Sequence, residues 1–176
     1  MPLAESASFK KNENKIWSIL NELIEAGLIV IKNKQNIKIG FSIDLQFVHA
    51  KEIDTMDFGK PEGIRLVLFE GKQAVSIVDF IYSGREITFL HSIKKDHLKN
   101  SLDLIKSIEK EILNNPKKYA ATYLNFLINL SPFVLIKNKS SIIYFKYEKK
   151  RLIRQTKKDI KKELKSIVSS RDKQIF

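Results

Sequence analysis

The chain has 176 residues, 43% of them hydrophobic, with 32 lysine and arginine residues against 20 aspartate and glutamate residues. This length and hydrophobic content fit one globular domain and argue against wholesale disorder. The formal net charge of +12 favours an anionic partner, such as nucleic acid, an anionic lipid surface or an acidic protein. The absence of cysteine excludes disulfides, thiolate zinc sites and thiol nucleophiles.

No targeting or membrane-spanning segment is expected. The N-terminus lacks the basic and apolar regions of a signal peptide. No apolar run approaches the roughly eighteen residues of a membrane span. We therefore expect a soluble, cytoplasmic protein. Because no G-x-G-x-x-G or P-loop pattern is present, no nucleotide cofactor is expected, and the sequence has no G-x-S-x-G elbow for Ser-His-Asp catalysis. A small-molecule ligand is not expected either.

The first third of the chain predicts a helix and a long strand. Apolar residues recur at the spacing of one helical face, at Ile16, Leu20, Leu23 and Ile24. They predict a helix over 9–26 that ends at Gly27. Every odd residue from 37 to 47 is apolar, which predicts a strand with one face in solvent. A helix running into a hairpin also leaves a winged-helix module open. Residues 49–62 show little periodicity and predict a surface loop.

The middle of the chain predicts an antiparallel meander of three strands. Apolar runs cover 64–69, 74–82 and 86–91, and glycine-containing turns separate them. Branched and aromatic residues dominate these runs, and glycine supplies the positive φ that a tight hairpin needs. The meander is the part of the chain on which the predicted fold depends.

The last part of the chain predicts three helices and a hairpin. The first helix is capped by Ser92 or Asp96 and ends at Asn114, a buried helix covers 117–130, and the hairpin joins 133–136 to 141–145. The last helix covers 147–170. We therefore predict a single α+β domain over 1–176. Its antiparallel meander sheet packs against helices, and its C-terminal helix is basic and amphipathic.

The positive charge is concentrated in this last predicted helix. Residues 146–165 contain ten cations and three acids, a local excess of about +7. The predicted nucleic-acid-binding residues are Lys149, Lys150, Arg151, Arg154, Lys157, Lys158, Lys161, Lys162 and Lys165, joined by Lys34 and Lys38 near the first hairpin. An apolar stripe of Ile153, Ile160, Leu164 and Ile167 is expected to dock this helix on the core, leaving the cations outward.

Such a surface would follow a phosphate backbone without reading bases, since sequence readout requires side chains fitted to groove edges. Lysine outnumbers arginine in it, which favours bulk electrostatics over bidentate recognition. If about five phosphates were neutralised, log K would fall with log salt at a slope of roughly −4.5 on a duplex.

A second hypothesis comes from acidic residues beside the meander. Glu62 follows Pro61 just before the first strand, and Asp79 lies in the second. This order resembles the PD-(D/E)xK nuclease pattern over about residues 20–95. The resemblance implies that Glu62 and Asp79 bind Mg²⁺, with Glu22 or Glu25 as the helical acid. The sequence departs from the pattern at Ile81, where the family has its lysine; Lys94 or Arg85 would have to supply that charge.

Three functions therefore stay open. The sequence favours a non-enzymatic protein that binds nucleic acid without sequence preference and needs no cofactor. The alternatives are a metal-dependent nuclease, and a structural or membrane-apposed protein whose basic helix meets anionic lipid or an acidic partner. An exposed edge of the meander would allow pairing with a second subunit, although the pattern does not require it.

Overall fold

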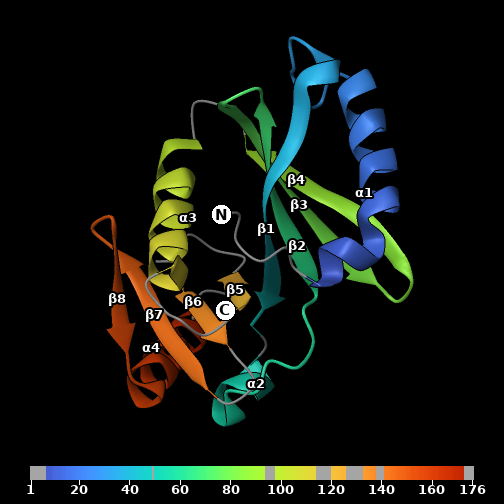
Figure 1. The fold of residues 1–176 in the computed structure, drawn as a ribbon. Coiled ribbons are helices and arrows are strands. Elements are labelled where there is room, and N and C mark those ends of the chain that lie inside the picture. The colour runs from blue at the N-terminus through green and yellow to red at the C-terminus, as the bar shows by residue number, and fades with distance from the viewer. Residues whose placement is uncertain are drawn as a thin grey trace.

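The strands form one eight-stranded sheet with helices on both faces (Figure 1). The computed structural model describes residues 7–48, 50–93, 98–113, 120–125, 133–137 and 141–172. Its elements are α1 (Ala7–Glu25), η1 (Lys34–Asn36), β1 (Ile37–Phe47), α2 (Ala50–Thr55), β2 (Gly63–Glu70), β3 (Gln73–Ser83), β4 (Glu86–Ile93), α3 (Leu98–Leu113), β5 (Ala120–Asn125), β6 (Phe133–Lys137), β7 (Ile142–Glu148), β8 (Arg151–Gln155) and α4 (Lys157–Asp172). The predicted α+β class, with an antiparallel meander packed against helices, is confirmed.

The sheet consists of two antiparallel meanders that meet at its centre. Its strand order is β4-β3-β2-β1-β5-β6-β7-β8. Every neighbouring pair is antiparallel except β1 and β5, which pair in parallel from Asp44 opposite Thr122 to Phe47 opposite Asn125. Each meander is followed in the chain by a helix, α3 after the first and α4 after the second. Because β4 and β8 are the first and last strands in this order, they form the two edges of the sheet.

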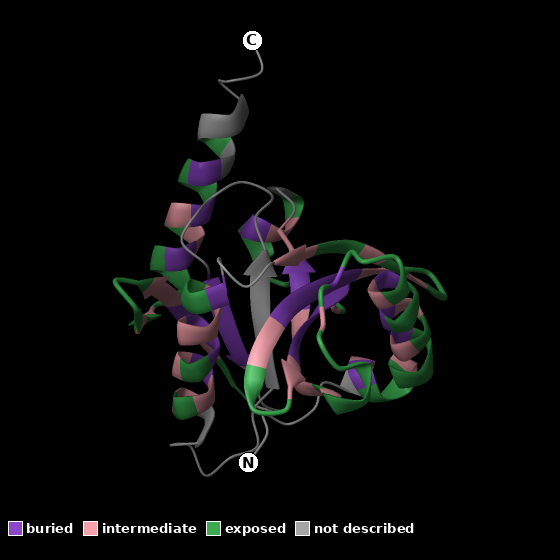
Figure 2. Ribbon diagram, turned by 90° about the horizontal axis from the view of Figure 1, so that it is seen from above, coloured by how far each residue is buried: buried purple, intermediate pink, exposed green. Residues whose placement is uncertain are grey.

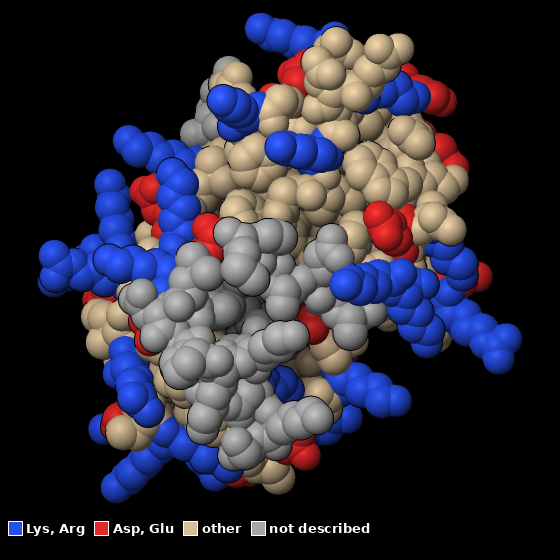
Figure 3. All heavy atoms as spheres, in the orientation of Figure 1, with Lys and Arg blue, Asp and Glu red and all other residues tan. Residues whose placement is uncertain are grey.

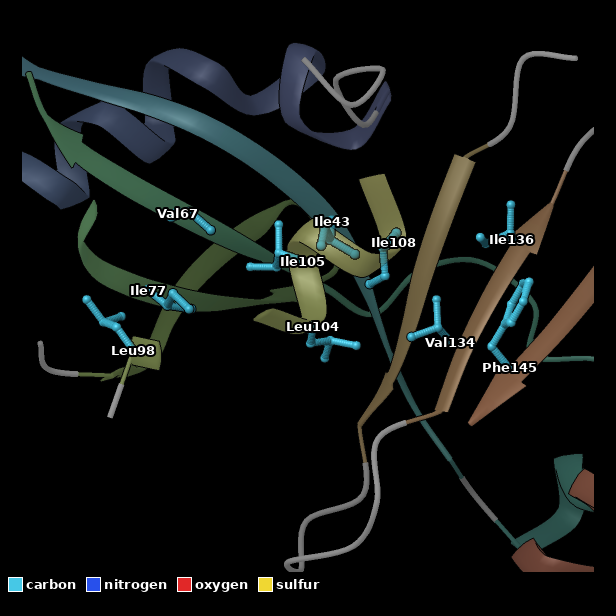
Figure 4. Packing of buried hydrophobic residues seen from close by; sticks show 10 residues of the cluster. All are labelled: Ile43, Val67, Ile77, Leu98, Leu104, Ile105, Ile108, Val134, Ile136 and Phe145. Atoms are coloured by element: carbon cyan, nitrogen blue, oxygen red, sulfur yellow. The ribbon is translucent and has the colours of Figure 1, made fainter. Parts of the chain in front are cut away.

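Helix α3 covers the junction between the two meanders. Its Leu104, Ile105 and Ile108 are buried among residues of both halves, as Figure 4 shows. Val67 of the first meander lies on one side of the helix and Val134 of the second on the other. Leu98, at the start of the helix, is buried on the same side. One core thus holds both meanders together.

The opposite face of the sheet has two separate coverings. Helix α1 buries Ile16 and Leu20 against β2 and β3. Helices α2 and α4 bury their own apolar residues against β6 and β7. Buried residues concentrate on the strands at the middle of the molecule (Figure 2). The predicted helix over 9–26 is confirmed, and Gly27 follows it with a φ of 71°. Because α1 packs on the sheet and not on other helices, the winged-helix alternative is not realised.

A bulge in β1 changes which face its apolar residues serve. Ile39 pairs with Leu68 and Phe41 with Val67, so Gly40 is an extra residue in the ladder. Ile39 consequently packs on the α1 side, whereas Phe41 packs on the α3 side. The predicted strand over 37–47 is confirmed. The prediction that one face of this strand lies in solvent is wrong, because helices cover both faces of this central strand.

Two other predictions are wrong. The predicted helix over 117–130 contains strand β5, while residues 114–119 and 126–132 lie outside the described residues. A short apolar run is compatible with a strand or with part of a buried helix, and periodicity alone does not separate the two. The predicted loop over 49–62 contains α2, and its Ile53 and Phe58 are buried.

The predicted C-terminal helix begins ten residues later than expected, at Lys157. Residues 147–155 instead complete β7, form a two-residue turn and build β8. Thr156 caps α4: its hydroxyl oxygen accepts a hydrogen bond from the Asp159 amide at 3.1 Å and its hydroxyl donates to the Asp159 carboxylate at 2.6 Å. The helix begins at this cap, and no earlier, because residues 151–155 are held in the sheet by pairing with β7.

We expect replacement of Gly40 by alanine to destabilise the fold. A Cβ at this position would overlap the ring of Phe69, which packs edge-on against Phe41. Overpacking of this kind costs about 1–3 kcal/mol, measured here as a lower urea midpoint. If the overlap with the Phe69 ring causes this destabilisation, shortening the ring by Phe69→Leu should relieve it. The double variant should then be destabilised by less than the sum of the two single variants. Additive losses would contradict this explanation.

Candidate nucleic-acid interface

Seven exposed cations follow one another from the β7–β8 turn to the second turn of α4. We call them the basic ridge: Lys149, Lys150, Arg151, Arg154, Lys157, Lys158 and Lys162. None of them forms an ion pair with another described residue. Figure 3 shows lysine and arginine side chains projecting along the left and lower-left margin, where β7, β8 and α4 lie in Figure 1.

The turn at the start of the ridge has an unusual sequence for its backbone. Lys149 and Lys150 have φ angles of 49° and 62°, and they link Glu148 directly to Arg151 across the hairpin. A two-residue hairpin turn with two positive φ angles normally takes Asn-Gly, because most side chains disfavour this region. Here it carries two lysines at the tip of an exposed hairpin.

Strand β8 forms one edge of the sheet. Leu152 packs toward α3, and its outward neighbours Arg151 and Ile153 are exposed. Charged side chains on an edge strand discourage pairing with another chain, so the arginines also protect this edge. Ile153 is 42% exposed and does not belong to the apolar stripe predicted for the helix, so that assignment is wrong.

The rest of the predicted stripe lies as expected on α4. Ile160, Leu164 and Ile167 are buried against β6, β7 and α2. Lys158 and Lys162, four residues apart, are exposed on the helix. Because the stripe is buried in the core, it is not available to enter a lipid bilayer.

Not every predicted cation is free for a ligand. Lys161 and Lys165 both approach Asp54 of α2, with Nζ to Oδ1 distances of 3.5 and 2.6 Å. The hydrogen bond from Lys165, followed by its charge, holds the pKa of Asp54 below its ordinary value. The Lys146 ammonium donates to Glu163, and this hydrogen bond raises the pKa of Lys146. These pairs neutralise the cations nearest the packed interfaces.

The two cations predicted near the first hairpin are separate from the ridge. The Lys34 Nζ atom lies 2.6 Å from Oε1 of Glu25. The hydrogen bond from Lys34, followed by its charge, lowers the pKa of the Glu25 carboxyl group. Lys38 is exposed on β1, in the other meander. The structure therefore does not bring Lys34 and Lys38 together with the cations of α4.

The predicted nuclease acid Asp79 belongs to a buried ion pair. Both of its oxygens accept hydrogen bonds from Arg65 at 2.8 Å, and Nε2 of His91 lies 3.2 Å from Oδ2. Asp79 is completely buried. Removing one partner of such a pair costs about 3–5 kcal/mol, because the other charge is left uncompensated. Asp79 thus has a structural role, and the signal for it in the sequence was Arg65, a cation inside an apolar strand.

The other predicted nuclease residues do not gather around Asp79. The Glu62 carboxylate accepts hydrogen bonds from the Gln46 side chain at 2.9 Å and the Phe47 amide at 3.2 Å. Glu22 is on α1, which covers the opposite face of the sheet from Asp79. Among the described residues no group of three or more acids or histidines is placed to hold a metal. Lys94 lies outside the described residues.

Comparisons with known proteins give no further guide to this site. No protein-family model, curated protein or solved structure matches the chain. Within the part of the chain that the structure describes, no helix is both long enough and apolar enough to cross a membrane.

We expect the Lys149→Asn/Lys150→Gly variant to be more stable than the natural chain. Both new residues accept the positive φ angles that the turn imposes, so the free energy of unfolding should rise by about 1 kcal/mol in urea titrations. The matched control is Lys149→Gln/Lys150→Gln, which removes the same charges without suiting the turn. If the control gains as much, charge repulsion and not backbone strain explains the effect.

Proposed function

We propose that the protein binds nucleic acid through the basic ridge and contacts the phosphate backbone without reading sequence. The observation that carries the proposal is a group of seven exposed cations on the β7–β8 turn, β8 and the start of α4, none of which has an acidic partner among the described residues. The two acids of α4 within this run have other partners: Asp159 hydrogen-bonds Thr156, and Glu163 hydrogen-bonds Lys146. The neutral Thr156 does not cancel the charge of Asp159, but the seven ridge cations outnumber this acid, so the ridge keeps a net positive charge.

The dimensions of the ridge suit a polyanion. Strand β8 extends about 17 Å, and the first six residues of α4 extend about 9 Å along the helix axis. Double-stranded DNA carries one charge per about 1.7 Å of axis, so a surface of this length faces several phosphates at once. Five of the seven ridge cations are lysines, which bind phosphate as point charges and do not impose the bidentate geometry of arginine.

The strained turn also supports the proposal. An Asn-Gly turn would close this hairpin with less strain, yet the chain places two lysines there. A strained backbone position in a native protein is a reason to look for a functional role. Here the gain is two further ammonium groups at the far end of the ridge.

We expect the affinity for random-sequence duplex DNA to fall steeply with salt, and Lys158→Gln/Lys162→Gln to weaken both affinity and salt dependence. Each phosphate contact adds about 0.9 to the slope of log K against log salt, so the slope should decrease by about 1.8. Fluorescence anisotropy across a salt series measures both quantities. The matched control, Lys72→Gln/Lys99→Gln, removes two exposed cations outside the ridge.

Three results would contradict the proposal. One is an affinity that does not respond to salt. Another is equal weakening in the ridge variant and its control, which would show that only net charge matters. The third is binding to an acidic protein or to anionic vesicles, but not to DNA or RNA. The ridge would then be a binding surface for a partner other than nucleic acid.

We expect Asp54→Asn to strengthen nucleic-acid binding. Asp54 is an exposed acid that neutralises Lys161 and Lys165, so its loss adds two unpaired cations beside the ridge. Exposed ion pairs contribute about 0–1 kcal/mol to stability, so the fold should tolerate the change. The same anisotropy titration should show higher affinity and a steeper salt slope. Asp57→Asn controls for net charge, because Asp57 is an exposed acid that forms no ion pair with a described residue, and an equal gain there would contradict the assignment.

A further inference from the structure

A second basic site lies at the other end of the sheet from the basic ridge. A cleft of about 630 Å³ opens between the first turns of α1, the β3–β4 turn and the Lys60–Pro61 segment. Four cations line it: Lys11, Lys15, Lys60 and Arg85. Glu86 is the one acid among its lining residues, all of which are described. In Figure 1 α1 and α4 lie on opposite sides of the molecule, so the two basic surfaces are separate.

The cleft is held in shape by contacts between the segments that form it. The Lys15 ammonium donates a hydrogen bond to the Arg85 carbonyl at 3.1 Å, which ties α1 to the β3–β4 turn. Gly84 allows this two-residue turn through its φ of 62°. The side chains of Lys11, Lys60 and Arg85 form no ion pair with any described residue. Three cations are therefore available where only one acid opposes them.

The remaining lining is suited to the non-ionic part of a ligand. Pro61, Ile87 and the ring of Tyr82 give the cleft an apolar wall, and Ser8 and Asn12 add polar groups. The Tyr82 hydroxyl is buried, and this burial, helped by the charge of Asp44, raises its pKa. The hydroxyl accordingly remains protonated at neutral pH.

We propose that this cleft binds the phosphate group of a nucleoside phosphate, independently of the basic ridge. The cations would hold the phosphate, and the sugar or base would pack on the apolar wall. A volume of this size falls within the range of small-ligand sites. The phosphate has two sources, a free nucleotide or a single-stranded nucleic acid, which present the same chemistry to the cleft. This site was not expected from the sequence, which contains no nucleotide-binding motif.

The test is calorimetric titration of the full chain with ADP, pyrophosphate and a short single-stranded oligothymidylate. Two variants are compared: Lys11→Gln/Lys60→Gln/Arg85→Gln in the cleft and Lys157→Gln/Lys158→Gln/Lys162→Gln in the ridge. Each removes three exposed cations. We expect saturable binding of ADP that weakens by at least about tenfold in the cleft variant and little in the ridge variant. Thermal unfolding confirms that each variant is folded, and the single variants Lys60→Gln and Arg85→Gln replace the triple one if it is not.

The probes separate the two sources of phosphate. Tighter binding of the oligothymidylate in competition with ADP would identify a strand, whereas binding of ADP and pyrophosphate alone would identify a free nucleotide. The proposal is overturned if none of the three probes binds saturably, or if both variants weaken binding equally. Duplex binding that is unchanged in the ridge variant, together with ADP binding that is lost only in the cleft variant, would contradict the proposed function and support this proposal, so the two proposals fail separately.

Discussion

The parallel pairing of β1 with β5 is the interaction on which the arrangement of this molecule depends. Every other strand contact is a local antiparallel pairing within one meander or the other. Only this pairing makes the two meanders one sheet, and α3 secures it by burying Ile105 and Ile108 over the junction. Parallel neighbours require a long crossover, and the chain provides one that includes the first meander and α3. The positions of α1 and α4, and of the charges near them, follow from this junction.

The same constraint explains where the charges lie. The middle of an eight-stranded sheet covered on both faces is dry, so a charge there must be paired, as Arg65 and Asp79 are. Unpaired cations are left for the turns, the edge strand and the helix starts. With strands about 4.8 Å apart, the β4 and β8 edges are on the order of 30 Å from each other along the sheet. This separation exceeds the Debye length of about 8 Å at physiological salt, so the charges of the cleft and of the ridge are screened from each other.

Much of the first half could be predicted from the sequence, because its signals are local. Alternating residues over 37–47 and glycine turns fix strands without tertiary information. The errors occur where local signals are ambiguous. Strand β5 reads as a buried helix, and Lys149-Lys150 is not a sequence that indicates a turn. A usable signal was present at Thr156, since Thr156-x-x-Asp159 is the spacing of a helix N-cap. The cleft had no such signal, because three distant segments form it.

The division between paired and unpaired cations along the C-terminal segment has a physical basis. Lys146 is only 19% exposed, so its charge would be costly without Glu163 beside it. Lys161, at 34%, likewise has Asp54. The ridge cations face water, where solvation makes a partner unnecessary for folding and where pairing would contribute little. Lys165 shares Asp54 although it is 54% exposed. Folding therefore pairs the lysines that it partly dehydrates and leaves the ridge cations charged and accessible. This division supports the proposal of a polyanionic ligand, because many weak phosphate contacts, each releasing a counterion, add up to useful affinity.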